Sequence, residues 1–169
     1  AGADRGVEDG EIITLGSLRL EAIGTPGHTS GCTSYFERDA GRLYTGDTLF
    51  VRGCGRTDFQ QGDAGTLYDS VTQKLFPLGD EVVVLPGHDY KGRTSSTLGE
   101  ERLHNPRLNY TQSRDDFIAT MASLKLAYPA KIHEALPANL YAGVRKPFQA
   151  GDSSDVAEVD INFVRTEGK

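Results

Sequence analysis

The sequence is poor in cysteine and in positive charge, and it has no long apolar run. Two cysteines among 169 residues are too few for a disulfide framework, and they lack a CxxC spacing. A net charge of −6 argues against binding to nucleic acid or an anionic membrane, because both require clustered positive charge. No segment approaches the roughly 18 apolar residues that cross a bilayer, and the first residues lack the features of a signal peptide. We therefore expect a soluble protein in a reducing compartment, either a bacterial cytosol (cytoplasmic) or a mitochondrial matrix.

Glycine is abundant instead, and it gathers in short polar loops. The 20 glycines concentrate in the segments TPGHTSG, TGD, RGCGR and PGHDYKG. This pattern is typical of tight loops rather than of a flexible linker, and functional residues are common in loops held by a rigid scaffold. We therefore expect the functional site in these loops.

Five apolar segments predict strands. EIITLG and SLRLEAIGT meet at a Gly-Ser turn, and CTSYFE and RLYTGD flank the turn-forming triplet DAG, so each pair predicts a hairpin. The run EVVVL is short, apolar and β-branched, which predicts a buried strand that leads into PGHDY.

Three further segments predict helices. After a polar loop over residues 48–65, helical spacing relates three apolar residues, Leu67, Val71 and Leu75. Residues 96–103 fit a short helix. Ser113 stands three residues before Asp116, a pair that resembles a capping box and predicts the start of another helix.

Three polar side chains follow predicted strands and form a candidate metal site. They are His28 in TPGHTSG, Asp47 in LYTGDTLF and His88 in VLPGHDY. The three become neighbours if their strands share one sheet. Imidazole suits iron, zinc and copper, and a carboxylate balances the charge of the cation. Each histidine alone would also fit an ordinary hydrogen-bonded loop residue.

The loop sequences resemble a known superfamily. TPGHTSG, TGDTLF, GCGRTDF and PGHDY are similar to the later motifs of the metallo-β-lactamase superfamily, over about residues 10 to 145. Within it, RGCGRTDFQQGD, PGHDYKG, ERLHNPR and LPANL resemble the persulfide dioxygenases. The resemblance implies an α/β fold, the αββα sandwich, and one Fe(II) held by two histidines and an aspartate. By motif, His28 is one histidine ligand and Asp47 is the carboxylate, in keeping with a facial triad.

The resemblance also implies a segment that this sequence lacks. The other histidine ligand would come from an upstream HxHxDH motif, and no HxH occurs here. We therefore expect residues 1–147 to be the C-terminal part of a metallo-β-lactamase-like domain and residues 148–169 to be a tail or linker. Without the missing N-terminal segment as its partner, such a domain would expose an apolar face.

The residues of the PGHDY loop are expected beside the metal. The resemblance implies that His88 lies near the iron without binding it and that Asp89 orients site groups by hydrogen bonding. It also implies that the Tyr90 hydroxyl points towards the iron and the substrate. The alternatives are a loop hydrogen bond for His88 and ordinary packing for Tyr90.

Two arginines and a cysteine complete the candidate site. Arg56 suits a carboxylate-bearing substrate such as glutathione persulfide, unless it is a surface arginine. Arg107 in HNPRL resembles a second family position that lines the site. Cys54 lies between two glycines and is either a reactive thiol near the site or a small buried thiol.

The resemblance implies an Fe(II)-dependent persulfide dioxygenase that oxidises glutathione persulfide with O2 to sulfite and glutathione once the domain is complete. The alternative enzyme is a glyoxalase-II-like hydroxyacylglutathione hydrolase, which needs two metals such as zinc. A third hypothesis is a metal-free fragment or pseudo-enzyme that acts as an interaction subunit. A homodimer is left open.

Overall fold

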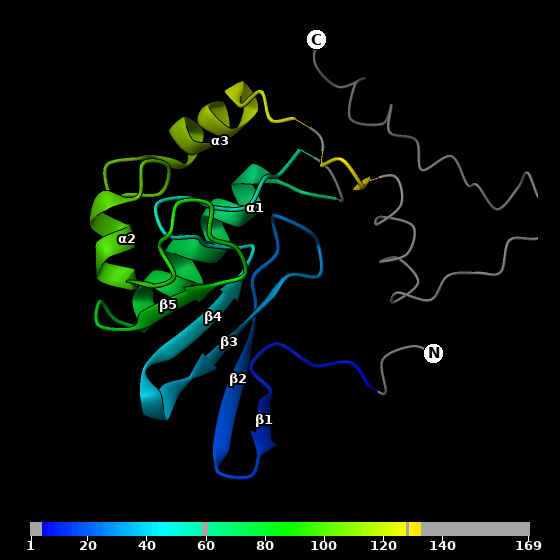
Figure 1. Cartoon of the computed structure of the whole chain (residues 1–169), viewed down its shortest axis with the longest axis vertical. Coiled ribbons are helices and arrows are strands. Elements are labelled where there is room, and N and C mark those ends of the chain that lie inside the picture. The colour runs from blue at the N-terminus through cyan, green and yellow to red at the C-terminus, as the bar shows by residue number, and fades with distance from the viewer. Residues whose placement is uncertain (1–4, 59–60, 128, 133–169) are drawn as a thin grey trace, which may run out of the picture. The chain divides into compact units, whose positions relative to one another are not determined.

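Figure 1 shows a computed structural model, which describes residues 5–58, 61–127 and 129–132. The chain divides into two units: residues 7–124, and the two ends of the chain, residues 1–6 with 125–169. Residues 7–124 hold all the helices and strands given below.

The second unit includes the predicted tail. Among its described residues, the Ile132 N–H donates to the Pro129 carbonyl. Residues 148–169 lie outside the described residues, so the predicted division after residue 147 stays a prediction.

Six strands form one mixed sheet in the order β1-β2-β3-β4-β5-β6. The strands are β1 (Ile12–Leu15), β2 (Leu18–Gly24), β3 (Thr33–Glu37), β4 (Arg42–Gly46), β5 (Val83–Pro86) and β6 (Ser96–Thr97). Neighbours are antiparallel except for β4 and β5, which are parallel. Strands β2, β4 and β5 therefore run in the same direction, and their C-terminal ends lie at the same end of the sheet.

Both predicted hairpins are confirmed, because β1 pairs with β2 and β3 pairs with β4. The second hairpin turns through a short 3-10 segment, η1 (Arg38–Ala40), and then Gly41. Gly41 has a φ of 61°, a left-handed conformation that glycine adopts without a steric penalty.

The first predicted helix is confirmed, and it is less regular than its spacing suggests. It begins as α1 (Ala64–Asp69), continues as the π-helical η2 (Ser70–Leu75) and ends as the 3-10 segment η3 (Phe76–Leu78). The three residues at helical spacing, Leu67, Val71 and Leu75, are all fully buried. Asp63 caps the helix by accepting a hydrogen bond from the Thr66 N–H.

The other two helices are α2 (Leu98–His104) and α3 (Arg114–Ser123). The prediction of helix from residue 96 was wrong at its start, because Ser96 and Thr97 pair with β5 as β6. Thr97 is extended and its hydroxyl accepts from the Glu100 N–H, so the helix begins only after it. The capping box at α3 is present as predicted. No helix in the described part of the chain is long and apolar enough to span a membrane.

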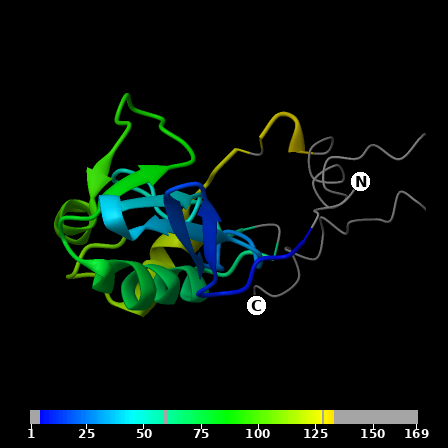
Figure 2. The ribbon, with the colours of Figure 1, turned by 90° about the horizontal axis from the view of Figure 1, so that it is seen from below.

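The helices of residues 7–124 pack on one face of the sheet (Figure 2). Phe36, Leu43 and Val84, one from each of β3, β4 and β5, are buried in a core with apolar residues of the helices. Alternate residues face the opposite way in a strand. On that side Tyr35 and Tyr44 form one lateral row with Leu85, and Tyr44 is 38% exposed. A sheet with one helical layer corresponds to half of the predicted αββα sandwich.

Candidate metal centre

The three predicted side chains meet where β2, β4 and β5 end. The Asp47 carboxylate lies between the two histidines: its Oδ1 is 2.6 Å from His88 Nδ1, and its Oδ2 is 3.4 Å from His28 Nε2. The side chain of His28 is 16% exposed and that of Asp47 is 27% exposed. The sheet therefore gathers residues that are far apart in the sequence into one small polar cluster.

The backbone carbonyl of Arg56 determines which nitrogen of the His28 ring carries the proton. His28 Nδ1 lies 2.7 Å from the Arg56 carbonyl oxygen. A carbonyl only accepts, so Nδ1 donates, and the neutral ring keeps its lone pair on Nε2. That lone pair faces an Asp47 oxygen, which is also an acceptor. Two such groups suit a shared cation between them, and metal-binding histidines commonly donate their other N–H to a carbonyl.

His88 contacts Asp47 through its Nδ1, whereas His28 faces Asp47 with its Nε2. The His88 Nδ1–H donates to Asp47 Oδ1, and the His88 side chain is 52% exposed. The His88 ring stacks on Tyr90, with centroids 5.7 Å apart, and meets the edge of Phe50 at 5.9 Å. His88 thus holds one oxygen of Asp47 and leaves the other directed at His28, and its predicted place beside a metal stays a prediction.

Glycines at the site allow the backbone to approach the polar cluster closely. A Cβ on Gly55 would lie 2.2 Å from the Asp47 carbonyl oxygen and 3.0 Å from His28 Nδ1. A Cβ on Gly87 would lie 3.1 Å from Asp47 Oδ1 and equally close to the Gly46 backbone. A larger residue at Gly55 would displace Asp47 or His28, so the glycine is needed for this packing.

The side chain of Arg56 pairs with Asp58 within its own loop. Arg56 Nε donates to Asp58 Oδ1, and Arg56 Nη2 donates to Asp58 Oδ2, both at 2.6 Å. The Arg56 hydrogen bond, more than any other interaction, lowers the pKa of Asp58. The predicted contact of Arg56 with a substrate carboxylate stays a prediction, and no sequence pattern indicates that the Arg56 carbonyl contacts His28.

Asp89 and Tyr90 lie on the exposed PGHDY loop. Asp89 Oδ1 accepts from the Lys91 N–H at 2.9 Å, and this backbone hydrogen bond is the main reason that its pKa is lowered. Asp89 therefore orders its own turn rather than His28 or Asp47. Tyr90 is 75% exposed. The predicted direction of its hydroxyl towards a metal stays a prediction.

Cys54 is buried, and Arg107 reaches the same loop. Cys54 is 4% exposed, and burial raises the pKa of its thiol. These properties fit the small buried thiol and not the reactive one, since a reactive cysteine needs exposure and a lowered pKa. Arg107 Nη1 donates to the Cys54 carbonyl at 3.3 Å and lies 3.8 Å from Cys54 Sγ.

The cluster brings together two side chains of types that commonly bind metals. His28 Nε2 and Asp47 Oδ2 fit a divalent cation by their chemistry and their orientation. Within residues 5–58, 61–127 and 129–132, no group of three or more His, Cys, Asp or Glu side chains is arranged to hold a metal ion. The described residues thus offer part of a ligand set.

Comparisons with known proteins show the family to which the cluster-bearing segment is similar. The model of the metallo-β-lactamase superfamily matches residues 2–88, which contain all three clustered side chains. The human mitochondrial persulfide dioxygenase ETHE1 is 48% identical over 147 residues, covering 87% of this chain and 57% of the human protein. The crystal structure of ETHE1 from Myxococcus xanthus has 48% identity and a TM-score of 0.77, covering 82% of this chain and 60% of that one.

A hydrolase of the same superfamily is also similar, over a shorter stretch. The hydroxyacylglutathione hydrolase GloC of Haemophilus influenzae is 40% identical over 102 residues, or 60% of this chain and 46% of that protein. The chain spans less than two thirds of the length of each of these relatives.

Proposed function

This chain belongs to the metallo-β-lactamase superfamily, and from that premise we propose that it is part of an Fe(II)-dependent persulfide dioxygenase. The substrates are glutathione persulfide and O2. Glutathione persulfide, O2 and water give glutathione, sulfite and two protons. The similarity to the human persulfide dioxygenase ETHE1 and to ETHE1 from Myxococcus xanthus, each at 48% identity, supports this reaction over others in the superfamily.

The arrangement of Asp47 between His28 and His88 is the observation that carries the proposal. A dioxygenase of this kind needs one metal with open positions, held by histidine and carboxylate. His28 Nε2 and Asp47 Oδ2 face each other, whereas His88 is bonded to the second oxygen of Asp47. His88 therefore supports one site instead of building another. Bound Fe(II) would supply the redox chemistry and the open coordination positions.

The residues of the chain contribute orientation and charge. The Arg56 carbonyl holds His28, and His88 holds Asp47, so neither ligand has to reorient when the metal binds. The Arg56 guanidinium attracts the carboxylates of the tripeptide, with Asp58 as its partner in the absence of substrate. Tyr90 is exposed and stacks on His88, so we propose that its ring contacts the substrate beside the cluster.

The open face of the sheet supports an upstream segment of the same domain as the partner of this chain. Tyr35, Tyr44 and Leu85 form a lateral row on that face, and Tyr44 is 38% exposed. Contiguous apolar surface usually marks a contact site. We infer that the upstream segment covers this row and supplies the second histidine. A mitochondrial matrix is favoured by the mitochondrial human relative, and a bacterial cytosol stays the alternative.

The similarity to GloC makes the hydroxyacylglutathione hydrolase the second candidate. In that case His88 would bind a second metal through its other nitrogen, and water activation would replace oxygen chemistry. The two functions differ in metal content, in the use of O2 and in the bond that is broken.

Metal content and two assays test the proposal. The chain is purified without oxygen, alone and with any upstream segment encoded in the same reading frame. Iron and zinc are then quantified, and oxygen uptake with glutathione persulfide is compared with hydrolysis of lactoylglutathione. About one iron with oxygen uptake supports the dioxygenase. Two zinc ions with hydrolysis would refute it, and silence in both assays with no metal would favour an interaction subunit.

Asp47→Asn is the matched control for these assays. The amide keeps the size of the side chain and its contact with His88 but removes the negative charge that a metal requires. If the activity belongs to this cluster, the variant loses metal and activity together.

A further inference from the structure

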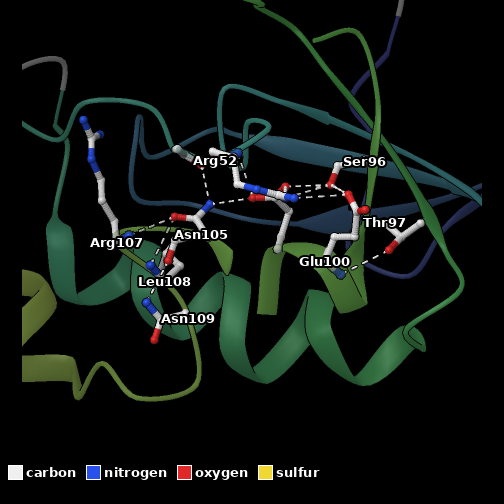
Figure 3. Close-up of polar contacts among 10 residues, drawn as sticks. Arg52, Ser96, Thr97, Glu100, Asn105, Arg107, Leu108 and Asn109 are labelled. Atoms are coloured by element: carbon white, nitrogen blue, oxygen red, sulfur yellow. Dashed lines mark hydrogen bonds and ion pairs between the residues drawn. The ribbon is translucent and has the colours of Figure 1, made fainter. Parts of the chain in front are cut away.

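Glu101 is a fully buried carboxylate on α2 that the proposed chemistry does not use. Its Oε2 accepts from the Arg52 N–H at 2.8 Å and from Asn105 Nδ2 at 2.9 Å. Its Oε1 accepts from the Ser96 hydroxyl at 2.6 Å and from Arg52 Nη1. Figure 3 shows Arg52, Ser96 and Asn105 converging from three segments of the chain. A buried carboxylate is tolerated when it is paired and hydrogen-bonded in this way.

Two features separate this network from an ordinary buried ion pair. One of the four donors is the backbone N–H of Arg52, so Glu101 binds the chain itself and not only a side chain. Arg52 also has a φ of 58°, a left-handed conformation that is uncommon for residues other than glycine. Such a conformation persists where its surroundings hold it, and it is frequent beside functional sites. Glu101 holds it from one side, together with the two backbone hydrogen bonds between Phe50 and Gly53 that close the turn.

The loop of residues 52–56 is held along its length by the same part of the fold. Asn105, itself bonded to Glu101, donates to the Gly53 carbonyl at 3.1 Å. Arg107, whose own N–H donates to Asn105, reaches the Cys54 carbonyl. One side of the loop is therefore fixed by α2 and the turn after it.

The other side of that loop contacts the metal ligands. The Gly55 N–H donates to the Asp47 carbonyl at 2.9 Å. The Arg56 carbonyl accepts from His28 Nδ1 at 2.7 Å. Residues 52 to 56 thus form a continuous bridge, in which each residue makes a backbone contact, from the buried carboxylate to the ring of His28.

We propose that Glu101 is a positioning residue of the metal centre. It fixes the loop of residues 52–56 so that the Arg56 carbonyl keeps His28 as the Nδ1–H tautomer, with Nε2 turned to Asp47. The importance of that tautomer rests on the proposed metal-binding function, whereas the effect of Glu101 on it does not.

Glu101→Gln tests the proposal without changing the size of the side chain. Each Glu101 oxygen accepts from two donors, so the amide nitrogen of glutamine meets donors in either orientation. Glu100→Gln is the matched control, because Glu100 also bonds Ser96 and Arg52, is 55% exposed and lies next in the chain. Leu75→Ala controls for lost stability, since Leu75 is buried in η2.

The first measurement is the tautomer of His28 in the metal-free protein. Nitrogen NMR of protein labelled with 15N-histidine distinguishes the tautomers at about pH 8, where an ordinary histidine is neutral. Only four histidines have to be assigned. The parent, Glu100→Gln and Leu75→Ala should show the Nδ1–H form of His28, and Glu101→Gln should show a mixture or the Nε2–H form. An unchanged tautomer in Glu101→Gln, or an equal change in Leu75→Ala, would overturn the proposal.

The second measurement is affinity for Fe(II) and for Zn(II), each alone, in competition with a chelator. Partners of metal ligands usually change affinity by about 10- to 100-fold, so Glu101→Gln should bind at least about 10-fold more weakly. Glu100→Gln should stay within a factor of about two of the parent, because it leaves the loop contacts intact. Equal affinity of Glu101→Gln and the parent contradicts the proposal. Two zinc ions with thiolester hydrolysis would refute the dioxygenase and leave the tautomer result unaffected.

Discussion

Gly55→Ala should damage the metal centre through sterics alone, because Gly55 does not have a left-handed backbone. Its Cβ would lie 2.2 Å from the Asp47 carbonyl oxygen, and real Cβ contacts essentially never fall below 3.0 Å. At least 0.8 Å of movement (3.0 minus 2.2) is required. The 2.9 Å hydrogen bond from the Gly55 N–H to the same oxygen opposes that movement. Overpacking and the lost hydrogen bond together should cost about 2–4 kcal/mol.

Gly53→Ala is the control in the same loop. Its Cβ would meet nothing closer than 3.9 Å, and its backbone is likewise not left-handed. The same change of residue should therefore be neutral, or stabilising by up to about 1 kcal/mol through the entropy of the unfolded chain. The two glycines differ in their distance from Asp47 and not in chemistry.

Urea unfolding of both metal-free variants gives the free energies, and chelator competition gives their affinities for Fe(II). Gly55→Ala should unfold at a lower urea concentration than the parent. It should also bind iron roughly 10- to 100-fold more weakly, since the added methyl group displaces Asp47 or His28. Gly53→Ala should match the parent in both. If the two variants behave alike, the close approach at Gly55 does not position the ligands.

Three further predictions concern residues around the cluster. Arg56 lowers the pKa of Asp58 below its ordinary 3.8, so ionised Asp58 stabilises the fold above that pH, and the gain is lost as pH falls through the lowered pKa. The difference in unfolding free energy between the parent and Asp58→Asn should therefore shrink in acid; a constant difference would contradict this. Asp63→Ala removes the cap of α1 and should cost about 1 kcal/mol in urea unfolding. His88→Ala should retain about one iron, bound roughly 10-fold or more weakly, if His88 holds Asp47 and is not itself a ligand, as proposed; complete loss of metal would show a ligand instead.

Local sequence signals predicted most of the fold. Both hairpins follow from alternating apolar residues with turn residues between them, and the capping box marks the start of α3. The π-helical stretch of η2 has no such signal, since Val71 and Leu75 fit the spacing of an α-helix equally well. The prediction extended the helix over Thr97 because a two-residue strand that pairs with β5 leaves no periodic signal in the local sequence.

Residue types at the ends of the predicted strands were enough to predict the candidate metal site, but they could not predict its backbone contacts. His28, Asp47 and His88 were predicted because residue type and position together indicate a metal site. The carbonyl of Arg56 could not be predicted, because every residue carries a carbonyl and only the fold decides which one faces a histidine. The pairing of Arg56 with Asp58 within the same loop was likewise not predicted.

Glu101 shows which signal for a positioning residue was present in the sequence. Leu98, Glu101 and Asn105 are spaced three and four residues apart, so they share one face of the helix and the residue after it, and all three are fully buried. A carboxylate at a position where the helix otherwise faces the core requires a buried partner. The adjacent Glu100 is exposed, so composition alone could not separate the two. The positions of the two residues around the helix do separate them, because only Glu101 shares the buried face. Glu101 is therefore the carboxylate that must bind a group inside the protein. That group belongs to the loop of residues 52–56, in which the Arg56 carbonyl contacts His28.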